Sequence, residues 1–193
     1  KYLYLESKRG ILSAVQNGAV EFHTWGASVP DAKHPDRITM DLDPGPGVRW
    51  AQRVKATQLT RTVLEKLGLK CFLKTTGGKG LHVVAPIERK LGWDEVKEFT
   101  GLVAAFLVRA DPGLFIANMS KAKRGGKVFV DYLRNGETAS AVSPSSARAR
   151  KEAGVSTPIE WDELGRADIR EKFTVKTVPK RLASCTATSV RTG

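Results

Sequence analysis

The segment at residues 38–43 constrains the fold of this chain most strongly. It reads Ile-Thr-Met-Asp-Leu-Asp, and its alternation of apolar and polar residues is typical of a β-strand with one buried face. A Pro-Gly-Pro-Gly run at residues 44–47 follows directly and ends the strand, because proline cannot donate to a β-ladder. Side chains two positions apart on a strand share a face, so Asp41 and Asp43 project opposite the apolar set.

The rest of the hydrophobic pattern predicts several further strands and a few helices. Apolar residues at helical spacing predict helices over residues 6–16, 50–67 and 93–110, with a helical turn at 161–164. Strand patterns cover residues 20–25, 71–74, 81–86, 127–133 and 139–142, and the chain from residue 143 onward is predicted to be mainly loop. We expect 71–74 and 81–86 to form a hairpin around a glycine-rich turn. This order of elements predicts an α+β fold with helices on one face of a mostly antiparallel mixed sheet.

The composition describes a folded and strongly basic chain. Its 193 residues suffice for a well-buried domain, and the formal net charge of +12 favours a polyanionic partner such as nucleic acid. The charge is concentrated, because residues 118–151 hold eight basic and two acidic side chains, a net +6 and half of the total. Many basic proteins lack such a partner, so charge alone leaves that alternative open.

The cysteine count and the hydropathy of the sequence indicate the cellular compartment in which the chain is expected. Cys71 and Cys185 are too few and too far apart for a disulfide framework or a metal site, and Cys71 lies in an apolar strand pattern. No run of about 18 apolar residues exists, and the N-terminus does not resemble a signal peptide. We therefore expect a cytoplasmic protein without a membrane partner.

Three carboxylates are candidate metal ligands. Asp41 and Asp43 lie so close on one strand face that they repel unless a cation lies between them, and their hard oxygen atoms suit Mg²⁺ or Mn²⁺. The alternative is an ordinary turn at Asp43. Asp131 lies in the apolar strand pattern, where an unpaired carboxylate is costly, so it is either paired with a residue such as Arg134 or a third ligand. Two metal ions held this way activate a 3′-hydroxyl and stabilise a leaving pyrophosphate.

A glycine-rich turn at residues 75–80 is a candidate phosphate site. Its glycines let backbone N–H groups approach an anion, Lys79 adds charge and His82 follows on the next strand. The alternatives are a flexible hairpin tip and a histidine buried in the core. His23 is a weaker candidate. Arg148 and Arg150 would lie on one side of an extended segment, or on a solvated basic loop.

Six segments in order resemble the polymerase domain of bacterial DNA ligase D, a member of the archaeo-eukaryotic primase superfamily. They are FHTW (22–25), DLDPGPG (41–47), KTTGGKGLHVV (74–84), MSKAKR (119–124), VDYLRN (130–135) and RAR (148–150). The similarity covers residues 1–182, which would form a primase-polymerase (RRM-like) catalytic core, and residues 183–193 form a divergent tail. The resemblance also implies that a usual N-terminal part, which helps to bind a downstream 5′-phosphate, is lacking here.

The resemblance implies a template-directed nucleotidyltransferase that extends DNA 3′-hydroxyl ends or fills gaps with NTP or dNTP in non-homologous end joining. Such domains use two Mn²⁺ or Mg²⁺ ions, work with Ku and a ligase domain, and act at the bacterial nucleoid. Motif matching assigns catalysis and metal binding to Asp41, Asp43 and Asp131. It assigns nucleotide contacts to His23, Thr76, Lys79, His82 and Arg148. DNA contacts are assigned to Lys121, Lys123, Arg124 and Arg150.

The sequence departs from the family pattern at two positions, and two other functions remain alternatives. Thr76 stands where the family usually has serine, which keeps the hydroxyl, and Ser145 replaces an aromatic residue before the arginine pair. A metal-dependent nuclease would use the same carboxylates to activate water. A nucleic-acid-binding module without activity would need only the basic residues.

Overall fold

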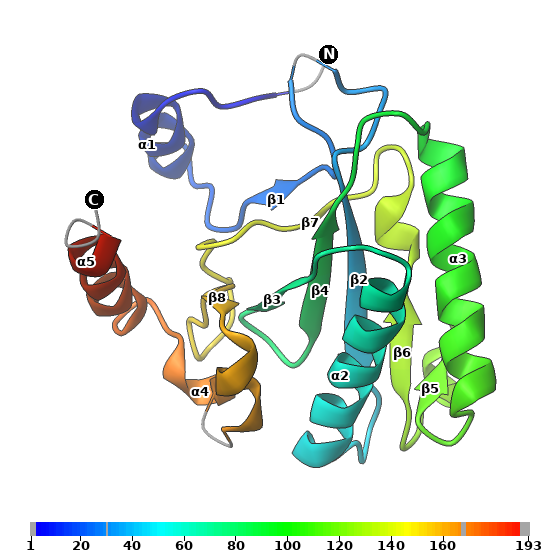
Figure 1. The fold of residues 1–193 in the computed structure, drawn as a ribbon. Coiled ribbons are helices and arrows are strands. Elements are labelled where there is room, and N and C mark those ends of the chain that lie inside the picture. Colours follow the sequence, from blue (N-terminus) through cyan, green and yellow to red (C-terminus); the bar gives the residue numbers. More distant parts are fainter. Residues whose placement is uncertain (1–2, 30, 167–168, 190–193) are drawn as a thin grey trace.

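A mixed six-stranded sheet forms the centre of the computed structural model, which describes residues 3–29, 31–166 and 169–189. The strands lie in the order β5 (Phe115–Ile116), β6 (Val128–Asp131), β2 (Arg37–Pro44), β4 (Leu81–Pro86), β3 (Phe72–Thr75) and β8 (Pro158–Ile159). Neighbours are antiparallel except β5 and β6, which are parallel. The predicted α+β class, the mostly antiparallel mixed sheet and the β3–β4 hairpin are confirmed (Figure 1).

Two long helices cover one face of this sheet. Helices α2 (Trp50–Lys66) and α3 (Trp93–Ala110) lie side by side along it (Figure 1). The apolar set of β2 (Ile38, Met40 and Leu42) is at most 3% exposed and belongs to the core that these helices share. Because side chains alternate along a strand, Asp41 and Asp43 lie on the opposite face.

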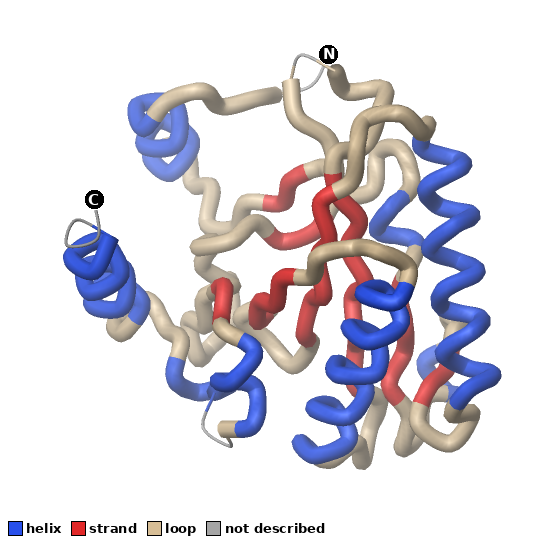
Figure 2. The backbone as a smooth tube through the Cα atoms, viewed as in Figure 1, coloured by secondary structure: helices blue, strands red, loops and turns tan. Residues whose placement is uncertain are grey.

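A short two-stranded ribbon lies on the other side of the sheet. It pairs β1 (His23–Thr24) with β7 (Ala141–Val142) in antiparallel register, 117 positions apart at the ladder pair Thr24 and Ala141. The sequence predicted longer strands at 20–25 and 139–142, whereas the ladder spans two residues on each side (Figure 2). Lys74 of β3 joins this ribbon to the main sheet, because its Nζ donates to the Val142 carbonyl at 2.8 Å.

The remaining elements are short or peripheral. They are α1 (Lys8–Gln16), the 3₁₀ helices η1 (Lys121–Lys123), η2 (Leu133–Asn135) and η3 (Trp161–Gly165), α4 (Ile169–Lys172) and α5 (Val178–Ser189). The helical turn predicted at 161–164 corresponds to η3. The strand predicted at 127–133 ends at Asp131, where η2 takes over after Tyr132.

The prediction of mainly loop after residue 143 is correct as far as η3, apart from β8, and is wrong for the part that holds α4 and α5. The two-residue β8 is too short to show a strand period. Tertiary contacts hold the segment: Phe173 is 3% exposed, and Arg181 of α5 donates to both carboxylate oxygens of Glu163, at 2.8 and 2.7 Å. Helix α5 runs through the boundary expected at 182–183, and residues 190–193 of the expected tail lie outside the described residues. None of the helices in the described part of the chain is both long and apolar enough to span a bilayer.

Candidate active site

One row of side chains crosses four neighbouring strands on the sheet face opposite α2 and α3. The ladders pair Lys74 with His82, His82 with Asp41, and Asp41 with Asp131. Residues directly opposite each other in antiparallel strands project to the same face. Asp43 lies two positions beyond Asp41 and shares that face. The structure therefore brings all three predicted metal-binding carboxylates to one face of the sheet.

Asp41 and Asp43 converge on the backbone of Gly80, the residue just before β4. A Cβ atom at this position would lie 2.9 Å from Asp43 Oδ1 and 3.4 Å from Asp41 Oδ1. Glycine therefore keeps open the space between the two carboxylates. Burial, together with the charges of Asp41 and Asp131, raises the pKa of Asp43 to about 6. A cation in this space would relieve that repulsion.

Arg134 lies between the carboxylates of the two strands. Its Nε is 3.3 Å from Asp41 Oδ2 and 3.2 Å from Asp131 Oδ2, and its Nη1 donates to the Ser140 carbonyl at 3.4 Å. Burial raises the pKa of Asp131, and Arg134 partly counteracts it. The pairing of Asp131 with Arg134, considered above as an alternative to metal binding, is thus present together with the carboxylate cluster.

Asn135 fixes the geometry of this cluster. Strand β6 ends at Asp131, so the backbone of Thr39, two residues before Asp41, has no strand partner on that side. The Asn135 side chain supplies one: its Oδ1 accepts from the Thr39 N–H at 2.7 Å, and its Nδ2 donates to the Thr39 carbonyl at 2.9 Å. A second bond from Nδ2, to the Tyr132 carbonyl at 2.8 Å, closes the turn that carries Arg134.

The buried carboxylate of Asp41 retains unused acceptor capacity. Its Oδ1 lies 3.2 Å from His82 Nε2, out of line for a hydrogen bond, and makes none with any described residue. Burial opposes ionisation, yet His82, Arg134 and Lys74 outweigh it and lower the pKa of Asp41. An ionised oxygen without a donor, next to two further carboxylates, fits a hard divalent cation. Among the described residues, no group of three His, Cys, Asp or Glu side chains is arranged as a complete metal-binding site. In this structure the positive charge next to Asp41 and Asp131 comes from Arg134.

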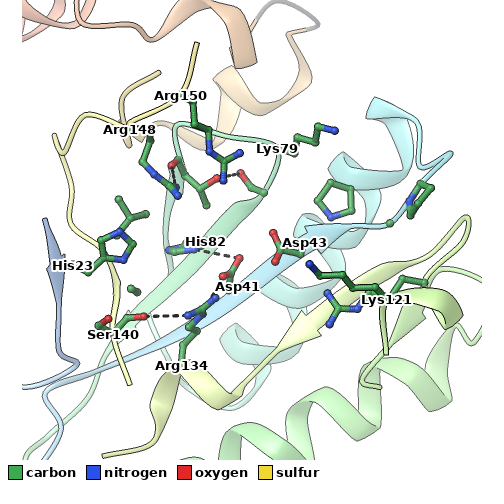
Figure 3. Close-up of a pocket in the computed structure, with 18 residues that line it drawn as sticks. His23, Asp41, Asp43, Lys79, His82, Lys121, Arg134, Ser140, Arg148 and Arg150 are labelled. Atoms are coloured by element: carbon green, nitrogen blue, oxygen red, sulfur yellow. Dashed lines mark hydrogen bonds and ion pairs between the residues drawn. The ribbon is translucent and has the colours of Figure 1, made fainter. Parts of the chain in front are cut away.

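A cavity of about 380 Å³ opens over this row (Figure 3). Most predicted site residues line it: His23, Asp41, Asp43, Thr76, Lys79, His82, Lys121, Arg124, Arg148 and Arg150. Asp131 and Lys123 are not part of the lining. His82 reaches the cavity from beneath and is 2% exposed, so in this structure its imidazole supports Asp41. The cavity therefore has carboxylates at its floor and basic groups around its rim.

The glycine-rich turn and the segment around Arg148 form one side of the rim. Thr76 Oγ1 donates to the Gly80 carbonyl at 3.1 Å, which closes the turn, and Arg148 Nη1 donates to the Thr76 carbonyl at 2.7 Å. Arg150 lies against Gly78, where a Cβ atom would be 2.9 Å from its Nη1, and Lys79 is exposed at the tip.

Lys121 and Arg124 form the other side of the rim. Arg124 stacks on Phe129 with its guanidinium carbon 3.6 Å from the ring centroid, and its Nη2 donates to the Met119 carbonyl at 2.6 Å. The Pro-Gly-Pro-Gly turn touches this segment, because a Cβ atom at Gly45 would lie 1.8 Å from the Arg124 carbonyl oxygen. With Arg150, three of the four residues assigned to DNA from the sequence thus line the cavity itself.

Residues 1–188 match the family described as the LigD primase-polymerase domain. The chain belongs to this family. It is 44% identical over 180 residues to the multifunctional non-homologous end joining protein LigD of Pseudomonas aeruginosa, covering 93% of this chain. It is 32% identical over 178 residues to the LigD protein of Mycobacterium tuberculosis, covering 88% of this chain.

A solved structure supports the same assignment. The polymerase domain of Mycobacterium tuberculosis ligase D, determined in complex with DNA, matches 83% of this chain with a TM-score of 0.78 and 32% identity. The chain covers 58% of that domain, 21% of the Pseudomonas protein and 24% of the mycobacterial LigD protein. It thus spans only a part of the LigD relatives that it matches.

Three residues of this LigD primase-polymerase domain were not among the predicted site residues. Arg134 had a signal, because it follows Asp131 by three positions, and it was considered only as a pairing partner. Asn135 and Lys74 lie in the matched segments 130–135 and 74–84, but their roles were not predicted, because these roles depend on backbone groups of β2 and β7 that lie far away in the sequence. Lys74 is 6% exposed, and burial lowers its pKa to about 8 against the attraction of Asp41.

Proposed function

We propose that this chain is the catalytic core of a template-directed nucleotidyltransferase, which extends DNA 3′-ends or fills gaps with ribo- or deoxyribonucleotides in non-homologous end joining. One observation carries the proposal: three carboxylates from β2 and β6 lie on one sheet face beneath a cavity with a basic rim. Membership of the LigD primase-polymerase domain family supports it.

Asp41, Asp43 and Asp131 are the proposed ligands of two Mn²⁺ or Mg²⁺ ions. When bound, such ions activate the primer 3′-hydroxyl and neutralise charge on the leaving pyrophosphate. The chain itself fixes where the carboxylates stand. The β2–β6 ladder sets Asp41 opposite Asp131, Asn135 locks the end of that ladder, and Gly80 leaves the adjoining space free.

The basic rim favours a triphosphate substrate. His23, Thr76, Lys79, His82 and Arg148 are the proposed contacts to the incoming nucleotide. Thr76 and Lys79 belong to a glycine-rich turn whose N–H groups can face phosphate oxygens, and the Arg148 guanidinium packs over the same turn. A nuclease that activates water for attack on a diester has no need of a second phosphate-binding region, so the rim supports nucleotidyl transfer over hydrolysis.

DNA is the proposed macromolecular partner. Lys121, Lys123, Arg124 and Arg150 are the proposed contacts to its phosphates, and the net charge of +12 supports long-range attraction. The structural relative was determined in complex with DNA, and the sequence relatives are named non-homologous end joining proteins. Cooperation with a ligase domain is proposed on the same ground, and cooperation with Ku is proposed from the resemblance of the sequence motifs to the DNA ligase D polymerase domain.

Primer extension on a gapped duplex tests this function. The substrate carries a downstream 5′-phosphate, Mn²⁺ is supplied, and ATP is compared with dATP. The variant is Asp41→Asn, and the matched control is Asp94→Asn, an exposed aspartate in the first turn of α3. We expect extension by the parent chain and by Asp94→Asn, and a loss of at least about 100-fold in Asp41→Asn, because a metal ligand matters more than its supporting groups.

Three other outcomes would contradict the proposal. Products shorter than the primer would indicate a nuclease. DNA binding without extension in the presence of Mn²⁺ and nucleotides would indicate a binding module. Full extension by Asp41→Asn would falsify the metal assignment.

A further inference from the structure

Glu21 joins two of the proposed nucleotide contacts through one carboxylate. Its Oε2 lies 2.9 Å from His23 Nε2 and accepts from Arg148 Nε at 3.0 Å. Its Oε1 accepts from the backbone N–H of Ala149 at 2.8 Å. The carboxylate thus contacts the imidazole, the guanidinium and the backbone that follows it. Glu21 itself is not part of the cavity lining.

The two groups that Glu21 joins come from distant segments. His23 lies on β1, and Arg148 lies 125 positions later, beyond β7. The segments meet in the β1–β7 ribbon, which is extended by bonds from the Ser143 N–H to the Phe22 carbonyl at 2.8 Å and from the Phe22 N–H to Ser146 Oγ at 2.9 Å. These bonds align the backbones. Among the described residues, only Glu21 connects the His23 and Arg148 side chains to each other.

The contacts occupy two of the three nitrogen atoms of the Arg148 guanidinium and leave the third for a ligand. Its Nε is bound by Glu21 and its Nη1 by the Thr76 carbonyl, whereas its Nη2 makes no hydrogen bond to a described residue. The side chain is 14% exposed, so the guanidinium is held rather than solvated. A hydrogen bond from His23, and further bonds from Ala149 and Arg148, hold the pKa of Glu21 at about 2, so its charge persists at neutral pH.

We propose that Glu21 is a positioning residue that fixes His23 and Arg148 as one preformed unit for the phosphates of the incoming nucleotide. The proposal rests on the proposed function. Two basic groups that are held in place before binding lose less conformational freedom when an anion arrives, which increases affinity without a new contact. Glu21 therefore acts on nucleotide binding through His23 and Arg148, and has no contact of its own with the substrate.

Equilibrium binding of Mn²⁺-ATP, together with steady-state primer extension, tests the proposal. Glu21→Ala is expected to weaken ATP binding and raise the KM for ATP by about 10-fold, the lower end for groups that orient ligands. We expect kcat and the affinity for DNA to change less than about 2-fold. Glu21→Gln keeps one acceptor oxygen and so can accept from the Ala149 N–H or from Arg148 Nε but not from both, and it should show an intermediate loss of ATP affinity. Ser146→Ala, which removes a ribbon bond without touching either basic group, should leave ATP binding unchanged.

A double-mutant cycle separates positioning from general stability. If Glu21 acts through the two basic groups, Glu21→Ala has less than about a 3-fold effect on ATP affinity when His23 and Arg148 are both alanine. An equal 10-fold loss in both backgrounds, or an equal loss in Ser146→Ala, would overturn the proposal. If Glu21→Ala does not fold, the same cycle with Glu21→Gln decides. If the parent chain extends primers and Glu21→Ala binds ATP as tightly as the parent, only this inference is refuted. If the parent chain neither binds ATP nor extends primers, the proposed function is refuted as well.

Discussion

Asp41 and Asp131 lie directly opposite each other in the β2–β6 ladder, and the Nε of Arg134 is within 3.3 Å of a carboxylate oxygen of each. The buried Asp41 and the half-buried Asp131, 90 positions apart in the sequence, therefore share one counter-charge. The Arg134 guanidinium thus reduces the repulsion between the two carboxylates, and a divalent cation between them would reduce it further.

Divalent cations should stabilise the chain through the carboxylate cluster. At a Mn²⁺ concentration 100 times its Kd, binding to the folded state contributes about 2.7 kcal/mol, which for a chain of this size raises Tm by about 5–10 °C. Asp131→Asn should remove most of this shift and Asp94→Asn none. Thermal melts with and without Mn²⁺ measure it, and an undiminished shift in Asp131→Asn would show that the ion binds elsewhere.

Gly45 should be intolerant of any side chain. A Cβ atom there would meet the Arg124 carbonyl oxygen at 1.8 Å, and the Gly45 N–H bonds to the Lys127 carbonyl at 2.9 Å, so neither backbone can move freely. Gly45→Ala is expected to cost about 3 kcal/mol or more in the free energy of unfolding. Gly125→Ala, in the facing loop, meets no atom within 4 Å and is the control. Urea denaturation compares the two, and equal stability would contradict the close approach.

Asn135 should matter for the stability of the chain. Asn135→Ala leaves the buried N–H and carbonyl of Thr39 without partners, at about 1–3 kcal/mol each, so we expect the free energy of unfolding to fall by about 2–6 kcal/mol. Asn135→Asp should also lower the free energy of unfolding, because a carboxylate cannot donate a hydrogen bond to the Thr39 carbonyl. Chemical denaturation measures the loss. A wild-type unfolding midpoint in Asn135→Asp would show that the donor side of the amide is not needed.

Glu21 should contribute stability that disappears in acid. Its folded pKa of about 2 lies below its ordinary value of 4.5, so the contribution is fully present above pH 4.5 and is lost as the pH falls toward 2. The difference in unfolding free energy between the parent chain and Glu21→Gln should therefore be constant from pH 7 to about 5 and shrink below that. Urea titrations at pH 7, 4.5 and 3 test this, and a difference that grows in acid would reverse the assigned sign.

The local pattern of the sequence was sufficient for the elements that carry the carboxylates. A period of two at 38–43 placed Asp41 and Asp43 opposite the buried set of β2, and helical periodicity located α2 and α3 to within a residue. Periodicity works here because these elements are long and have one buried face. It missed β5, β8, α4 and α5, which are short or are held by contacts such as that of Glu163 with Arg181.

The residues and their motif order, taken alone, determined the α+β class, the LigD primase-polymerase family and the identity of the candidate carboxylates. Only the tertiary structure decided that Asp131 faces Asp41, that Arg134 and Asn135 complete this pair, and that Glu21 binds Arg148 across 127 positions. The physical reason is that strand order and ladder register bring these groups together. Register depends on the packing of the whole sheet and leaves no period in any single segment.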